Sequence, residues 1–125
     1  MMRFFCVLVT ILTLSPLAHA SEAPTADQFK QLSSATLSYW AGVVISQSCG
    51  LDHAQADDEF RKALVKWSLT SDQRQQLFRS IIGAAMWVGS GPKKPANWCD
   101  QQRSQVRQYY VPLEKLNRDE PYEGR

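Results

Sequence analysis

Residues 70–89 read TSDQRQQLFRSIIGAAMWVG, and their apolar side chains recur at the spacing of an α-helix. Steps of three and four positions place apolar residues on one helix face. The stripe comprises Leu77, Phe78, Ile81, Ile82, Ala85 and Val88. Thr70 and Gln73 form a capping box, in which each side chain bonds an open backbone N–H of the first turn. The segment therefore predicts an amphipathic helix, and Gly83 within it allows another helix to approach closely.

The preceding sequence carries a longer series with the same periodicity, which begins at Asp27. The residues on its apolar face are Phe29, Leu32, Thr36, Trp40, Val43 and Val44. Asp27 or Thr25 can cap the start of this helix, and Gly50 is placed to end it. Because residues 43–45 are β-branched, a local strand is the alternative there.

Another helix is expected to begin near Asp52, where the pattern D-x-x-Q over residues 52–55 suits a helix start. Its apolar stripe comprises Phe60, Ala63, Leu64 and Trp67. Acidic residues lead its polar face and basic residues follow, an order that complements the helix dipole. We therefore interpret Asp57, Asp58 and Glu59 as a solvated first turn.

The last predicted helix begins near Asn97, after the loop GSGPKKP of residues 89–95. It carries Trp98, Cys99, Val106, Tyr109 and Tyr110. Pro112 lacks a backbone N–H and is expected to kink or end this helix, after which Leu113 and Leu116 add one more turn. The segments together predict an all-α fold, a small bundle of about four helices over residues 27–116.

The ends of the chain have other roles. Met1-Met2-Arg3, the apolar run from Phe4 to Leu14 and the small residues of Ala18-His19-Ala20 have the layout of a secretory signal peptide over residues 1–20. Cleavage after Ala20 predicts a periplasmic or secreted protein, with no later stretch long enough to span a membrane. Residues 21–26 are expected to form a mobile lead, and residues 117–125 a disordered tail.

Two cysteines remain after Cys6 leaves with the signal peptide. An even pair in an oxidising compartment predicts one disulfide between Cys49 and Cys99. A metal site with His53 is the alternative, but it lacks the fourth ligand that structural zinc sites have. We therefore expect neither a metal nor another cofactor.

Few groups suited to catalysis remain in the mature chain. His53 is its one histidine, and the nucleophile-elbow pattern G-x-S-x-G is absent. No catalytic residue is therefore assigned, and we expect a non-catalytic protein. Two alternatives stay open: a small hydrolase that uses His53 with Asp57, Asp58 or Glu59, and a bundle that holds an apolar ligand or haem. The second alternative requires Met86 or His53 as a ligand and an internal cavity lined by Ile81, Ile82 and Trp87.

The mature segment keeps thirteen Lys and Arg and twelve Asp and Glu residues, so that it is almost neutral. Such a charge balance gives no long-range attraction to nucleic acid. A protein partner is favoured instead, because Trp and Tyr are enriched at protein interfaces. The candidate partner-binding residues are Trp98, Tyr109, Tyr110, Arg103, Arg107, Lys93 and Lys94. We expect Trp40, Trp67 and Trp87 to belong mostly to the core.

The combination of an export signal, a few helices and a disulfide resembles small helical periplasmic immunity proteins, which neutralise secreted cell-wall toxins. The resemblance concerns the layout and implies an inhibitor or immunity-type accessory factor. Its partner would be another envelope or secreted protein.

Overall fold

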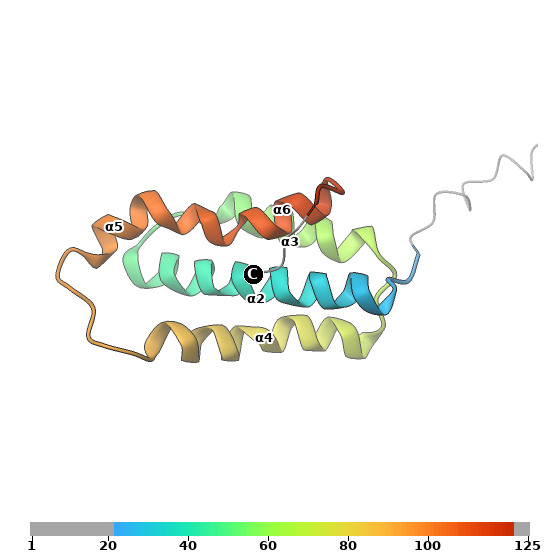
Figure 1. Cartoon of the computed structure of the whole chain (residues 1–125), viewed down its shortest axis with the longest axis horizontal. Helices are drawn as coiled ribbons and strands as arrows, with labels where there is room; N and C mark the ends of the chain where they lie inside the picture. The colour runs from blue at the N-terminus through green and yellow to red at the C-terminus, as the bar shows by residue number, and fades with distance from the viewer. Residues whose placement is uncertain (1–21, 122–125) are drawn as a thin grey trace, which may run out of the picture.

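The computed structural model describes residues 22–121, which form an all-α bundle (Figure 1). The helices are α2 (Ala26–Cys49), α3 (Ala54–Lys66), α4 (Ser71–Gly89), α5 (Trp98–Gln105) and α6 (Val111–Asn117), with a 3₁₀ helix η2 (Val106–Tyr109) between the last two. Over this range no strand forms, and the β-pairing is an isolated bridge between Glu22 and Trp67. The predicted signal peptide lies outside the described residues.

The ends of α2 and α4 confirm the expected local signals. Thr25 caps α2 and Thr70 caps α4, each in a reciprocal capping box with the glutamine three positions on. Gly50 ends α2 in the left-handed conformation at φ 67°, where a glycine has no steric penalty. The expected box over residues 52–55 does not form: α3 begins at Ala54 with His53 as its N-cap, and the Asp52 side chain accepts a hydrogen bond of 2.9 Å from the Ala54 N–H.

The helices pack around α2, which lies between α4 on one side and α3, α5 and α6 on the other (Figure 1). The core residues of α2 include Leu32, Tyr39 and Val43. α4 packs along α2, and α2 is its principal neighbour among the described helices. Its contacts with α3 are side-chain contacts, among them the edge-to-face pair of Phe78 with Phe60.

The last predicted helix is divided into three pieces. α5 ends at Gln105, one 3₁₀ turn follows, and Pro112 lies in the first turn of α6. Proline cannot donate the hydrogen bond that a continuous helix requires at this position, and 3₁₀ turns are common where α-helices end or connect. The division places Tyr110 in the core, where its hydroxyl and that of Ser46 share a hydrogen bond of 2.8 Å.

The predicted disulfide is present between Cys49 and Cys99, with Cα atoms 5.3 Å apart. It joins the end of α2 to the start of α5 and therefore holds the loop after α4 close to the bundle.

Candidate functional site

α4 exposes apolar side chains that the sequence pattern assigns to the core. Leu77 and Val88 of the predicted stripe are buried, but Phe78 is 47% exposed and Ile82 61%. Met86 is 70% exposed and Trp87 59%, so the prediction that Trp87 belongs to the core is wrong. We call Phe78, Ile82 and Met86 the α4 face; they are spaced four residues apart and share one side of the helix.

The composition of α4 explains this exposure. From Ile81 to Val88, every side chain is apolar or absent, apart from the indole N–H of Trp87. Eight residues take more than two turns of helix, so apolar groups point in all directions. A helix that is apolar all round is normally buried. Because α2 covers one side of α4, the remaining apolar side chains stay exposed to solvent.

A groove runs between α2 and α4 on the flank nearest η2, with a volume of about 320 Å³. This volume is at the lower end of the range for ligand pockets, roughly 300–1,000 Å³. The residues that line this α2–α4 groove are Ser34, Leu37, Ser38, Ala41, Gly83, Ala84, Trp87 and Tyr109. Gly83, Ala84 and Ala41 are small, while Leu37, Trp87 and Tyr109 are large and apolar or aromatic. The groove can therefore accept apolar side chains from outside.

Tyr109 is held in this groove by contacts on both sides. The Ser38 hydroxyl donates a hydrogen bond of 2.8 Å to the backbone carbonyl of Tyr109. The rings of Tyr109 and Trp87 meet edge to face, with centroids 6.1 Å apart. An adjoining hollow of about 350 Å³ shares these two rings and extends to the loop at Ser90–Lys94.

The structure separates the predicted partner-binding residues into groups. Lys94 lies 4.9 Å from the centroid of the Trp98 ring and donates a hydrogen bond of 2.6 Å to the Val88 carbonyl, near Tyr109. Lys93 is exposed in the same loop. Tyr110 is buried and offers no surface to a partner; burial raises the pKa of its hydroxyl.

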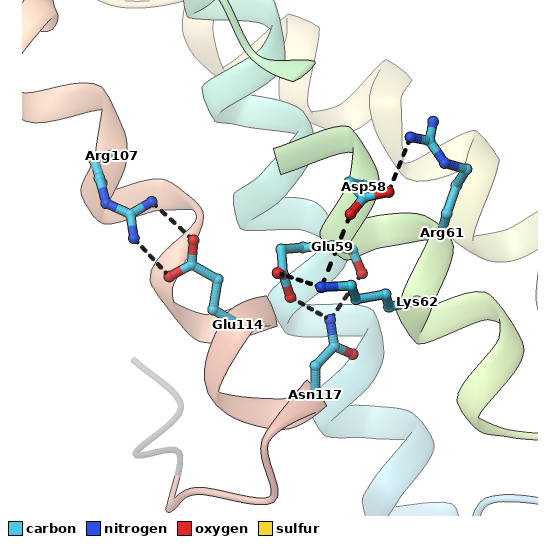
Figure 2. A network of polar contacts seen from close by, with 7 residues as sticks. All are labelled: Asp58, Glu59, Arg61, Lys62, Arg107, Glu114 and Asn117. Atoms are coloured by element: carbon cyan, nitrogen blue, oxygen red, sulfur yellow. Dashed lines mark hydrogen bonds and ion pairs between the residues drawn. The ribbon is translucent and has the colours of Figure 1, made fainter. Parts of the chain in front are cut away.

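The two predicted arginines lie apart from this group. Arg103 is exposed and faces Asp100 at 3.9 Å. Arg107 forms a bidentate pair with Glu114, at 2.8 and 3.0 Å (Figure 2). The hydrogen bonds to the Glu114 carboxylate raise the pKa of Arg107. The Glu114 side chain is almost fully buried, so this pair compensates a charge that would be costly alone.

The acidic residues of α3 act mainly in structure. Glu59 accepts hydrogen bonds from the side-chain amide of Asn117 on α6 and from Lys62, while Asp58 pairs with Arg61 (Figure 2). Asn117 also donates to the Glu59 backbone carbonyl, at 2.8 Å. These contacts connect α3 to the last turn of α6 and engage the carboxylates of Asp58 and Glu59 in ion pairs and hydrogen bonds.

Asp57 has a different environment, because its carboxylate contacts two other polar side chains. Its carboxylate accepts a hydrogen bond of 2.6 Å from the Tyr39 hydroxyl and lies 2.9 Å from His53 Nδ1. Burial, followed by the hydrogen bond to Asp57, raises the pKa of Tyr39. His53, Asp57 and Tyr39 line a shallow hollow of about 340 Å³ with Trp40 and Phe78. The arrangement orients the imidazole, as a carboxylate does in general-base sites.

The residues expected to line an internal ligand cavity do not do so. Ile82, Met86 and Trp87 are largely exposed, and Met86 is not among the residues that line the hollow at His53. Within residues 22–121, no three His, Cys, Asp or Glu side chains gather in a way that could hold a metal ion. In the same range, no helix has the length and apolar character needed to cross a membrane.

Sequence reasoning missed Leu37, Ile82 and Met86 as surface residues. For Ile82 and Met86, the available signal was the uninterrupted apolar composition of residues 81–88, which exceeds what one neighbouring helix can cover. Comparison of the chain with protein-family models, curated proteins and solved structures gives no match.

Proposed function

We propose that this chain is an exported, non-catalytic binding protein of the bacterial envelope, of the inhibitor or immunity type. The observation that carries the proposal is the exposure of Ile82 and Met86, at 61% and 70%, on the helix that also forms one wall of the apolar α2–α4 groove. Contiguous exposed apolar surface on a soluble domain marks an interaction site. The partner is another envelope or secreted protein.

Two features support an extracytoplasmic location. The first is the signal-peptide pattern of residues 1–20. The second is the Cys49–Cys99 disulfide, because disulfides persist in oxidising compartments such as the periplasm.

Charge on α4 and on the loop that follows it indicates the chemistry of the partner. α4 and the loop after it carry Arg74, Arg79, Lys93 and Lys94 against the single acid Asp72. A second copy of this chain would bring like charges together, which opposes association. A partner with an apolar patch bordered by acidic residues would match both the exposed apolar side chains of this surface and its excess of basic residues.

The test compares three proteins: the wild type, a control variant and a double variant of α4. Each is recovered from the native periplasm under mild crosslinking, together with whatever it binds. The wild type and a Val65→Ser control should recover one partner in stoichiometric amount. Val65 is an exposed apolar residue on α3, so the control makes the same chemical change on another helix. The double variant Ile82→Ser/Met86→Ser should lose the partner. Retention of the partner by the double variant, or recovery of the protein alone, would contradict the proposal.

A small hydrolase is the second candidate, and the contact between His53 and Asp57 is the observation that favours it. An imidazole with Nδ1 bonded to a carboxylate can present Nε2 as a base. Hydrolysis of 4-nitrophenyl acetate by the wild type should then be lost in both His53→Gln and Asp57→Asn. Equal rates for the three proteins would exclude this candidate.

A further inference from the structure

We propose that the partner inserts an amphipathic α-helix into the α2–α4 groove, with acidic residues at the end nearest Lys93 and Lys94. This inference rests on the proposed function and adds the class of ligand, the place of contact and its orientation.

Three elements of the fold form the walls of the α2–α4 groove. α2 contributes Leu37 and Ser38, α4 contributes Gly83 and Trp87, and η2 contributes Tyr109. In a regular bundle a helix packs against two neighbours, whereas α4 has one principal neighbour here. A helix from outside would become the second neighbour of α4 and would also contact α2.

Small residues allow that helix to come close. An added Cβ on Gly83 would find only the Leu37 Cδ1 nearby, at 3.8 Å, so the space above Gly83 belongs to the groove. With Ala41 and Ala84 beside it, the surface is low between the side chains of Leu37 and Trp87. A ridge of apolar side chains at helical spacing fits such a depression.

The backbone chemistry of the groove favours a helix over an extended peptide. A common way for an extended peptide to bind is to add to an exposed strand, and residues 22–121 contain no sheet to extend. The Ser38 hydroxyl already donates its hydrogen bond to the Tyr109 carbonyl. A helix satisfies its own backbone hydrogen bonds, so it loses little on entering an apolar groove.

Charge determines the orientation of the bound helix. The loop at the carboxyl end of α4 carries Lys93 and Lys94, and Lys94 lines the hollow that continues the groove past Trp87 and Tyr109. Carboxylates on the partner would lie near these amines. A flat anionic membrane would also attract these amines. Unlike a helix, however, a membrane surface has no side chain that could fill the depression over Gly83.

The experiment compares two glycines of the same helix. Gly83→Leu places a side chain in the groove, whereas Gly89→Leu places the same side chain in open space at the end of α4. With the partner recovered from the periplasm, titration calorimetry should show at least a tenfold weaker Kd for Gly83→Leu and less than a twofold change for Gly89→Leu. Lys93→Glu should weaken binding at least fivefold, with Lys62→Glu on α3 as the unaffected control.

The outcomes separate the two proposals. If Ile82→Ser/Met86→Ser loses the partner but Gly83→Leu binds as the wild type does, docking on α4 stands and the groove inference is overturned. If no partner is recovered, both fail. Sedimentation with phosphatidylglycerol vesicles that is equal for the wild type and Gly83→Leu, without protein-partner binding, would instead assign the surface to a membrane and overturn the helix inference.

Discussion

Gly42 of α2 lies directly against the ring of Tyr110: a Cβ at Gly42 would be 2.5 Å from Tyr110 Cε1. This close approach packs the turn between η2 and α6 onto α2. The adjacent Tyr109 is thereby brought to the wall of the α2–α4 groove, where the Ser38 hydroxyl bonds its carbonyl. One glycine in the core thus helps to shape the candidate binding surface.

Gly42→Ala is expected to destabilise the protein. The Tyr110 ring cannot move aside easily, because it is buried and its hydroxyl is bonded to Ser46. Overpacking costs about 1–3 kcal/mol, of which the higher helix propensity of alanine offsets up to about 1 kcal/mol. Because an approach of 2.5 Å is too close for any real Cβ, the cost should lie at the upper end of this range, and urea unfolding should show a net loss of about 2 kcal/mol. An unchanged midpoint would contradict the contact.

Gly83→Ala is expected to have the opposite effect. Its Cβ would meet Leu37 at an ordinary contact distance of 3.8 Å, and the position is in the interior of α4. Replacing glycine by alanine inside a helix stabilises it by about 0.5–1 kcal/mol. The urea midpoint should therefore rise. A fall in the midpoint would show that the groove is closed over Gly83.

Loss of the disulfide should remove a large part of the stability. Cys49 and Cys99 are 50 residues apart in sequence. The chain-entropy treatment gives about 4 kcal/mol for a loop of this length. Cys49→Ser/Cys99→Ser should lower the free energy of unfolding by about this amount in urea. A change below about 1 kcal/mol would mean that helix packing alone holds α5 in place.

Stability should fall at alkaline pH. Burial raises the pKa values of Tyr39 and Tyr110 above the ordinary value near 10. Above pH 10 the unfolded chain releases these protons while the folded chain keeps them, so the free energy of unfolding declines as pH rises. Each tyrosine contributes at most about 1.4 kcal/mol per pH unit. Urea unfolding from pH 8 to 11 should show a smaller slope for Tyr39→Phe; identical slopes would refute the role of Tyr39.

Local features of the fold were predictable because their causes are local. A capping box needs only Thr70 and the glutamine three residues later, and Gly50 ends α2 through its own conformational freedom. The disulfide followed from the even number of cysteines that remain after the predicted signal peptide.

The candidate site depends on the placement of whole helices, which periodicity does not specify. The stripe through Phe78 and Ile82 has the same spacing whether one neighbour or two cover it. Similarly, the aromatic pair Tyr109–Tyr110 gives no indication that a 3₁₀ turn would bury Tyr110 and leave Tyr109 at the groove. These differences come from tertiary packing.

The most direct test places a photo-crosslinking amino acid at Met86 on the α4 face and, as a control, at Lys62 on α3. Both residues are exposed, and they lie on different helices. After irradiation of the native periplasm, the account predicts one discrete adduct with a second protein from position 86 and none from position 62. The absence of an adduct at position 86, or the same adduct from both positions, would contradict docking on α4.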